Sequence, residues 1–468
     1  MVWKNNLENP IFQLIGSQAD ELGLSAYVIG GYVRDWFLRR VLTDIDIVVV
    51  GSGIALAEAL GKKLGTKVTV YKTFGTAALR YSGCEIEFVG ARRESYNFDS
   101  RKPTVENGTL ADDQSRRDFT INAMAFGLNS SNYGELTDPF DGMEDMQARI
   151  IRTPLEADKT FSDDPLRMMR AVRFATQLGF DIAPQTMASI QKNAHRLEII
   201  SKERISTEVE KIMASENPSR GFYLLQESGL LNEFLPEMVE LMGVERVGSR
   251  AHKDNFIHTL KVLENITPHT NDLWLRWAAL LHDIAKPRTK RWDQRVGWTF
   301  HGHEVLGAKM VARIFARLKL PLDERMKFVQ KLVFLHLRPI ALVEEIVTDS
   351  AVRRLLFEAG DDIDSLMLLC QADITSSNDS KVERYMRNFD LVRQKMVEIE
   401  QKDRVRNFQP PITGEMIMTI YGIEPCRAIG DIKTVIKDAI LDGKIPNQYQ
   451  AAYELMEQIA QEMGLKKV

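Results

Sequence analysis

The chain has 468 residues, of which 44% are hydrophobic and 27% charged, and its formal net charge is −4. This composition is typical of a globular protein and excludes a disordered chain or one coated in basic surface, and its length predicts two to four domains. Three widely spaced cysteines argue against a disulfide framework, and the absence of a signal-like start or a run of about 18 apolar residues predicts a cytoplasmic protein without a membrane partner.

The first 150 residues alternate strand-like and helix-like segments. The predicted strands are residues 26–31, 44–50, 68–72, 76–82 and 84–91, and the predicted helix is residues 53–65. Beyond residue 150, apolar residues recur at three- and four-residue spacing, which predicts helices almost throughout. We therefore predict a multidomain α+β protein in which a mixed-sheet head domain is followed by an all-helical neck, body and tail.

Breaks in these patterns place the expected domain boundaries. Glycine near residue 243 and the proline pair at 410 and 411 are typical of connections between helical segments. The predicted domains are a head at 1–149, a neck at 150–245, a body at 246–400 and a tail at 401–468.

Two aspartates occur in the predicted strand DIDIVVV. Because side chains alternate along a strand, Asp44 and Asp46 share one face while Ile45 and Ile47 point into the core. Neighbouring carboxylates repel each other, and Mg²⁺ relieves that repulsion while keeping positions for phosphate oxygens. Such a pair fits two-metal phosphoryl or nucleotidyl transfer. The third carboxylate is expected at Glu87; an ordinary solvated strand face is the alternative.

A double glycine precedes this strand. Gly30 and Gly31 end one predicted strand and open a helix, where free backbone N–H groups and the helix dipole favour a phosphate. Arg34, in the first turn, would add a forked donor to a triphosphate. This turn is therefore predicted to bind the phosphates of a nucleotide.

The run DDPLRMMRAVRF predicts a helix, with Asp164 as its N-cap and Pro165 at its first position. Asp163, Asp164 and Arg167 would then share a helix face, either as a surface ion pair or as a reader of bases. A carboxylate that accepts and a guanidinium that donates match the hydrogen-bonding edges of cytosine and adenine and oppose those of uracil and guanine.

Six motifs in order resemble a known family: GGYVRD, DID, RRDFTINAMAF, DPFDG, DDPLRMMRAVRFATQLGF and SKERISTEVEKI. The family comprises the nucleotidyltransferases that build tRNA 3′ ends and their poly(A) polymerase relatives. The resemblance implies metal binding by Asp44 and Asp46, and phosphate contacts from the Gly30–Gly31 turn with Arg34. It also assigns sugar and phosphate contacts to Arg117, Asp118 and Asn122.

The same resemblance makes residues 163–167 the base-selecting motif. The first acid of that motif is commonly glutamate, whereas here it is Asp163, one methylene shorter, which puts the role of Asp163 in doubt. Arg170 and Arg173 extend the charged stripe and would either contact the nucleotide or pack their stems against a neighbouring domain. In the last motif, a helix-stabilising charge network without a chemical role is expected from Glu203, Arg204, Glu208 and Lys211.

The implied reaction is attack of a tRNA 3′-hydroxyl on the α-phosphate of CTP or ATP, with Mg²⁺ bound and pyrophosphate released. The helical regions would bind tRNA, and no DNA partner is expected. Residues 92–118 resemble the mobile loop of the family, which argues against enzymes that add only two cytidines; a passive surface loop is the alternative. A poly(A) polymerase of the same family remains the nearest rival.

A second set of residues lies on predicted apolar helices of the body: His258, His282, Asp283, His303, His336 and Asp373. The pattern resembles the HD superfamily of metal-dependent phosphohydrolases. Its imidazoles and carboxylates suit a transition metal such as Mn, Ni or Fe. The set would either hydrolyse phosphoesters of RNA ends or persist as a helical scaffold. The remaining histidines are expected to be structural or surface residues: His195, His252, His269 and His301.

Overall fold

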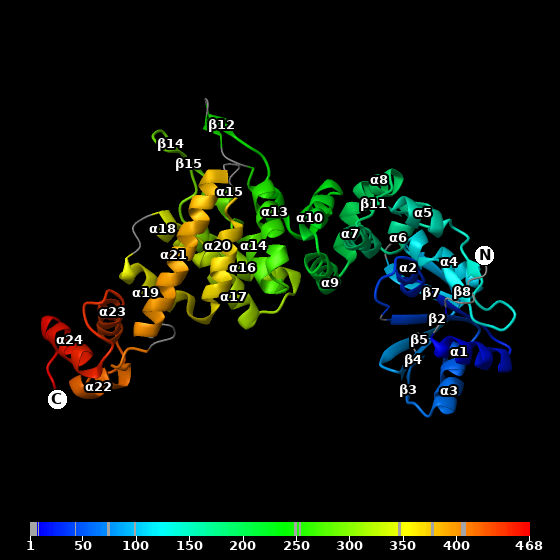
Figure 1. The fold of residues 1–468 in the computed structure, drawn as a ribbon, viewed down its shortest axis with the longest axis horizontal. Helices are drawn as coiled ribbons and strands as arrows, with labels where there is room; N and C mark the ends of the chain where they lie inside the picture. The colour runs from blue at the N-terminus through cyan, green and yellow to red at the C-terminus, as the bar shows by residue number, and fades with distance from the viewer. Residues whose placement is uncertain are drawn as a thin grey trace. The chain divides into compact units, whose positions relative to one another are not determined.

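The computed structural model describes residues 7, 9–42, 44–72, 75–97, 100–247, 250–251, 254–344, 348–375, 379–403 and 409–468 (Figure 1). The chain divides into two compact units, 1–236 and 237–468. Each unit is described by itself. The finer division into four domains stays a prediction.

Unit 1 begins with a mixed sheet whose strand order is β3-β4-β5-β2-β1-β8-β9. The strands are β1 (Ser25–Ile29), β2 (Asp44–Val50), β3 (Val68–Tyr71), β4 (Thr76–Tyr81), β5 (Cys84–Gly90), β8 (Ala125–Gly127) and β9 (Leu136–Thr137). The pair β2 and β5 is parallel, and the other neighbours are antiparallel. The sheet confirms every strand predicted for the head, because strong β-branched alternation left little ambiguity.

Helices of unit 1 cover this sheet and continue beyond it. Those of the head are α1 (Pro10–Glu21), α2 (Gly31–Phe37), α3 (Gly53–Leu64), α4 (Leu110–Ser115), η2 (Thr120–Asn122) and α5 (Gly142–Ala148). Those that follow are α6 (Ala157–Asp163), α7 (Leu166–Leu178), α8 (Pro184–Asn193), η3 (Ala194–Ile199), α9 (Lys202–Met213), α10 (Pro218–Glu227) and α11 (Leu230–Phe234), with α12 (Pro236–Glu240) at the boundary. Unit 1 also contains a short parallel pair of strands, β10 (Ile150–Ile151) with β11 (Asp181–Ile182).

The expectation of a loop at residues 92–118 is wrong. The segment forms an antiparallel hairpin, β6 (Arg92–Asn97) with β7 (Ser100–Asn107), followed by α4. The sequences of these strands, RRESYN and SRKPTVEN, carry no clear apolar alternation, so periodicity did not predict them. Thr109 and Asp112 form a capping box that starts α4, a signal present in the sequence.

Unit 2 is mainly helical. Its helices are α13 (Asn255–Ile266), η4 (Thr267–His269), α14 (Leu273–Leu281), α15 (Lys286–Thr289), α16 (His303–Leu318), α17 (Glu324–Leu335), α18 (Leu337–Glu344), α19 (Asp349–Ala359), η5 (Gly360–Asp362), α20 (Ile363–Ala372), α21 (Asp379–Asp403), α22 (Gly414–Tyr421), α23 (Arg427–Leu441) and α24 (Tyr449–Glu462). Two hairpins interrupt them: β12 (Arg246–Val247) with β13 (Arg250–Ala251), and β14 (Arg291–Asp293) with β15 (Gly297–Thr299). Helix prediction for this region was therefore correct except at these short strands.

Candidate active site and metal centre

The acidic residues of the head lie on two neighbouring strands. In β2, Asp44 and Asp46 share one face, whereas Ile45 and Ile47 are buried on the other face. β5 runs parallel to β2 and places Glu87 directly beside Asp46. The three predicted carboxylates therefore lie at one place on the sheet, with the oxygen atoms that hard divalent cations prefer.

Burial and mutual repulsion strain these acids. Burial raises the pKa of Asp46, Arg117 lowers it, and the charge of Asp44 raises it further, with a net increase. Burial and the charge of Asp46 likewise raise the pKa of Glu87. The nearby guanidiniums, Arg117 for Asp46 and Arg92 for Glu87, do not outweigh burial, and a divalent metal ion would supply the further positive charge.

Glu85 is the poorer candidate for the third carboxylate. Its side chain is 56% exposed and lies 3.7 Å from Arg80, on the outer end of the strand. Among the described residues, the groups with three ligand atoms within 4.8 Å of one another are in unit 2, so the head carboxylates must change rotamer to share one ion.

Gly30 connects the carboxylates to a basic cluster. Its φ of 80° favours glycine, and a Cβ atom there would lie 2.8 Å from Nη1 of Arg117 and 3.7 Å from Oδ2 of Asp46. Gly31 follows as the first residue of α2. The absence of a side chain at Gly30 therefore lets the Arg117 guanidinium pack against the backbone beside Asp46.

Arg34 is predicted to offer its guanidinium to a triphosphate, but in the structure that guanidinium is bound to other side chains. Its Nε and Nη2 donate to both oxygens of Asp35, and Nη1 donates to Oδ1 of Asn122 over 2.7 Å. The residue is only 8% exposed. Arg34 thus braces α2 against η2 in this structure, since its neighbour Asp35 takes the bidentate position that sequence alone offered to a ligand.

A pocket of about 400 Å³ lies beside this turn in unit 1. It is lined by Arg116, Arg117, Asp118, Asp164, Leu166, Arg167, Arg170, Arg204, Thr207 and Glu208. Five of these were predicted to bind the nucleotide from sequence. The predicted residues Asp163, Arg173, Asn122, Arg34 and the two glycines do not line it. Its arginines make the pocket suited to an anion, and its acids offer acceptors for a base.

Asp118 is the buried anchor of this pocket. One oxygen accepts from the backbone N–H of Phe119 and from Nδ2 of Asn122, and the other accepts from Nε of Arg170 over 2.7 Å. Burial raises the pKa of Asp118, but Arg170 and Asn122 outweigh it and lower the pKa to about 2. Asp118 therefore fixes the guanidinium of Arg170 at the pocket wall.

The lowered pKa of Asp118 predicts an acid-dependent stability. Because folding lowers the pKa of Asp118, its ionised carboxylate stabilises the folded protein above pH 3.8. This stabilisation is lost as the pH falls toward 2. At neutral pH, Asp118→Asn should lower the free energy of unfolding by about 2 kcal/mol. The difference from the wild type should shrink below pH 4 in urea denaturation followed by circular dichroism. A difference that is constant with pH would contradict this assignment.

The prediction of one helix face for Asp163, Asp164 and Arg167 is wrong. Asp163 is the last residue of α6, Asp164 is extended with φ −140°, and α7 begins at Leu166 rather than at Pro165. Asp164 still caps α7, since its Oδ1 accepts from Leu166 N over 3.2 Å. The two acids therefore belong to the break between helices, and Asp164 and Arg167 both line the pocket.

Sequence reasoning missed the contribution of α9. Arg204 and Glu208 line the pocket, although they were assigned only to a helix-stabilising network. Arg204 lies 3.8 Å from Asp164, and Glu208 lies 2.8 Å from Nε of Arg173. Arg173 is 8% exposed and its guanidinium lies 4.2 Å from the ring centroid of Phe174. Arg173 thus joins α7 to α9 instead of facing a ligand.

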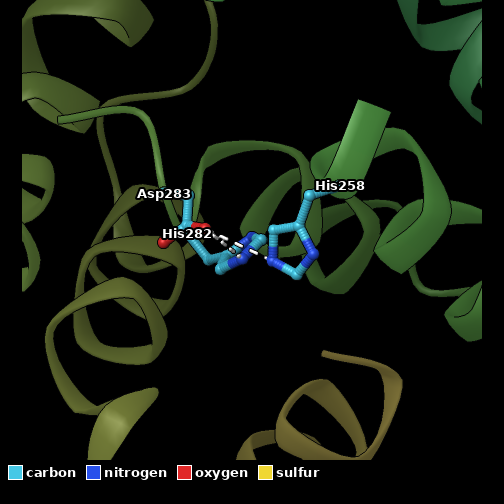
Figure 2. A group of neighbouring side chains, drawn as sticks. All are labelled: His258, His282 and Asp283. Atoms are coloured by element: carbon cyan, nitrogen blue, oxygen red, sulfur yellow. Dashed lines mark ion pairs between the residues drawn. The ribbon is translucent and has the colours of Figure 1, made fainter. Parts of the chain in front are cut away.

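In unit 2 the predicted His/Asp residues converge from five helices. His258 lies on α13, and His282 and Asp283 follow α14, where Figure 2 shows the two imidazoles directed toward Asp283. His303 begins α16, and His336 and Asp373 are the C-caps of α17 and α20. Helix ends, rather than helix faces, therefore supply most of the ligands.

Asp283 lies between two pairs of imidazoles. Its Oδ2 is 3.4 Å from Nε2 of His258 and 3.2 Å from Nε2 of His282. Its Oδ1 is 3.3 Å from Nε2 of His303 and 3.8 Å from Nε2 of His336. Two sets of three ligands consequently share this one carboxylate.

The second nitrogen of each imidazole is anchored. Nδ1 of His282, His303 and His336 lies 2.7–2.8 Å from a backbone carbonyl oxygen. Nδ1 of His258 lies 2.9 Å from the hydroxyl of Thr375. A carbonyl can only accept, so Nδ1 carries the proton and Nε2 presents a lone pair in the neutral rings.

Charge also favours a cation here. Burial lowers the pKa of His282, but Asp283 and Asp373 outweigh it and raise the pKa to about 10, while burial and His282 lower the pKa of His336 to about 4. Nε2 of His282 is buried and lies 3.2 Å from Oδ2 of Asp283, but without the geometry of a hydrogen bond. The donor set and this unsatisfied nitrogen both fit a divalent metal ion.

One nearby cation was missed from the sequence. Nζ of Lys286 lies 2.5 Å from Oδ2 of Asp283, one helical turn further along the chain. A lysine three residues after an aspartate is a signal that the sequence contained. Of the other histidines, His195, His269 and His301 are exposed as predicted, and His252 lies outside the described residues.

The sheet with its carboxylates and arginine-lined pocket, followed by a helical His/Asp centre, defines a nucleotidyltransferase joined to a metal-binding helical domain. Three family models match the chain: "Poly A polymerase head domain" at residues 26–152, "Probable RNA and SrmB- binding site of polymerase A" at 179–242, and "HD domain" at 255–377.

Two curated relatives match most of this chain. An A-adding tRNA nucleotidyltransferase of Deinococcus radiodurans is 31% identical over 91% of this chain and 94% of its own, and a multifunctional CCA protein of Shewanella frigidimarina is 34% identical over 64% and 71%. The chain belongs to the family of tRNA nucleotidyltransferases and poly(A) polymerases.

The fold also resembles that of a solved relative. A Thermotoga maritima CCA-adding enzyme complexed with tRNA has a TM-score of 0.60 and 22% identity, with coverage of 98% of this chain and 97% of that chain. Among the described residues, no helix combines the length and apolarity needed to cross a bilayer.

Proposed function

We propose that the protein adds C and A to the 3′ end of tRNA from CTP and ATP, with release of pyrophosphate, in the cytoplasm. The observation that carries the proposal is the placement of Asp46 and Glu87 side by side, with Gly30 close to both Asp46 and the Arg117 guanidinium. This arrangement puts potential metal ligands beside a potential phosphate donor. One curated relative is named a multifunctional CCA protein, and the other an A-adding tRNA nucleotidyltransferase.

The chemistry requires a nucleophile, a leaving group and charge neutralisation. The RNA 3′-oxygen forms a bond to the α-phosphorus, the α–β phosphoanhydride bond breaks, and the hydroxyl proton passes to solvent. Asp44, Asp46 and Glu87 would hold Mg²⁺, which when bound neutralises charge on the phosphates and lowers the pKa of the attacking hydroxyl. Arg117, whose guanidinium lies beside Gly30 and lines the pocket, would bind the phosphates.

Base selection would use Asp164 and Arg167. Nη2 of Arg167 donates to the backbone oxygen of Arg116 over 2.6 Å, which holds the guanidinium at the pocket wall. Its other N–H groups can meet the ring-nitrogen acceptor of cytosine or adenine, and a carboxylate can accept from the exocyclic amine. Uracil and guanine would leave desolvated groups unpaired, at about 1–3 kcal/mol each.

Arg167→Ala should therefore relax selectivity. We expect incorporation of UTP and GTP relative to CTP and ATP to rise by roughly tenfold or more, as one unpaired group is removed. Single-nucleotide addition with each labelled triphosphate measures this ratio. Arg220→Ala, which removes a guanidinium bonded to Asp181 elsewhere in unit 1, is the matched control. Unchanged selectivity in Arg167→Ala would remove that residue from base reading.

A second form of the activity is addition of the terminal A alone. The relative that spans 91% of the chain is named A-adding. Two tRNA substrates separate the possibilities, one ending before the CCA sequence and one ending in CC. Uptake of two C and then one A on the first supports CCA addition, whereas A uptake on the second alone supports A addition. Repeated A uptake on either would support a poly(A) polymerase.

The centre in unit 2 supports a separate hydrolase activity on phosphoesters of RNA ends. Its six residues would hold Mn, Ni or Fe, and the bound ion would supply an activated water. The pairing of each Nε2 with an anchored Nδ1 favours a working centre over a relic scaffold. Release of phosphate from an RNA that ends in a phosphate, in the presence of each metal, tests this activity.

A further inference from the structure

A basic and aromatic hairpin borders the metal centre of unit 2. It comprises β14 and β15, with the short α15 before it and Phe300 after it, and connects Asp283 to His303 along the chain. In Figure 1 this hairpin projects from the helices of unit 2. Two ligand residues at its base therefore place the hairpin at the rim of the centre.

Lysine side chains and aromatic rings lie next to one another in a series that runs from Asp283 into the hairpin. Nζ of Lys286 lies 2.5 Å from Asp283 and 5.7 Å from the ring centroid of Phe300. Nζ of Lys290 lies 4.7 Å from the ring centroid of Trp298. The ring centroid of Trp298 is in turn 5.1 Å from that of Trp292, its partner across the hairpin.

The outer end of this series is exposed. Trp292 is 37% exposed and Val296, in the turn, is 75% exposed. Arg291 and Arg295 are exposed on either side of Trp292 in the sequence. Between residues 286 and 295 there are five basic residues and one acidic residue, and Lys286, Arg288 and Lys290 pair with Asp283, Glu240 and Glu245. The excess of positive charge at the exposed end of the series therefore rests on Arg291 and Arg295.

We propose that the β14–β15 hairpin binds single-stranded RNA and guides its 3′ end to the metal centre. Exposed rings stack on bases of any sequence, and the basic residues pair with the phosphates between them. Flexible, unpaired RNA fits because stacked duplex bases cannot reach the face of Trp292. Lys286 lies at the inner end, where it faces both Asp283 and the incoming phosphate.

The test uses the full-length protein and an 8-nucleotide single-stranded RNA that contains 4-thiouridine and ends in a 3′-phosphate. Ultraviolet crosslinking followed by peptide mass spectrometry should place crosslinks within residues 286–300. Arg291→Glu with Arg295→Glu should reduce their yield roughly tenfold at 100 mM salt. Trp292→Ala should reduce the yield similarly and Trp292→Phe should restore most of it, since phenylalanine retains a stacking face.

The matched control is Lys309→Glu with Arg313→Glu, the same charge reversal on exposed positions of α16. It should leave the hairpin crosslinks unchanged. Crosslinks outside residues 286–300 alone, or a hairpin yield that the first reversal does not lower, would overturn the proposal. Nucleotide addition to tRNA, measured in parallel, reports on the head, so its failure in the wild type is a separate result.

Discussion

Asp46→Asn is expected to abolish nucleotide addition while making the metal-free protein more stable at neutral pH. The activity should fall roughly 10³-fold or more, because a metal ligand supplies several kcal/mol at the transition state. The stability should rise because burial holds the pKa of Asp46 above its ordinary value. A carboxylate whose pKa is raised by folding lowers the stability of the folded protein as the pH rises from the ordinary pKa to the raised one. The amide of the variant does not ionise and avoids this loss.

Two measurements check this result. Primer extension of tRNA with CTP and ATP reports activity, and thermal denaturation with a chelator present reports stability between pH 4 and 8. Glu85→Gln is the matched control, because its side chain lies on the neighbouring strand but is 56% exposed. Retained activity in Asp46→Asn would remove Asp46 from the catalytic centre, and a less stable variant at neutral pH would show that its charge is compensated.

Asp283→Asn is expected to remove the metal ion from unit 2 and leave nucleotide addition within about twofold of the wild type, as the two centres belong to separate compact units. Within the part of the chain that the structure describes, Asp283 is the carboxylate that faces all four imidazoles. Its loss also leaves the partly exposed Lys286 and the buried His282 near each other without that counter-charge. Unit 2 should therefore lose about 3–5 kcal/mol of stability.

Metal content by mass spectrometry after dialysis measures the first effect, and urea denaturation measures the second. His258→Gln should lower metal content with a smaller loss of stability, because the Asp283 charge remains paired with Lys286. Asp364→Asn, an exposed acid in the first turn of α20, serves as the control. Undiminished metal content in Asp283→Asn would contradict the assignment of the centre.

The sequence determined the head strands and the placement of three acidic residues on them. Alternation along DIDIVVV put Asp44 and Asp46 on one face, and the second strand carried Glu87, because period-two patterning is a local property of the backbone. The six residues predicted in unit 2 lie together, and the four imidazoles converge on Asp283. Their types and apolar surroundings are visible in the sequence, whereas their role as metal ligands stays a prediction.

The tertiary structure decided which side chains are available to a ligand. Arg34 and Arg173 matched the expected motif, yet Asp35 and Glu208 engage them, and Arg204 entered the pocket from a helix 40 residues beyond Asp164. Pairing between distant segments sets these contacts, and a one-dimensional pattern carries no information about a partner's rotamer.

What the letters fixed, then, is the local chemistry: strand faces, turn glycines and the kinds of ligand present. Packing alone chose between a helix face and a helix end for Asp163, and between a loop and a hairpin for residues 92–107. The reason is physical. Local periodicity reflects interactions a few residues apart, whereas the direction of a side chain within a site depends on neighbours that only the folded chain brings near.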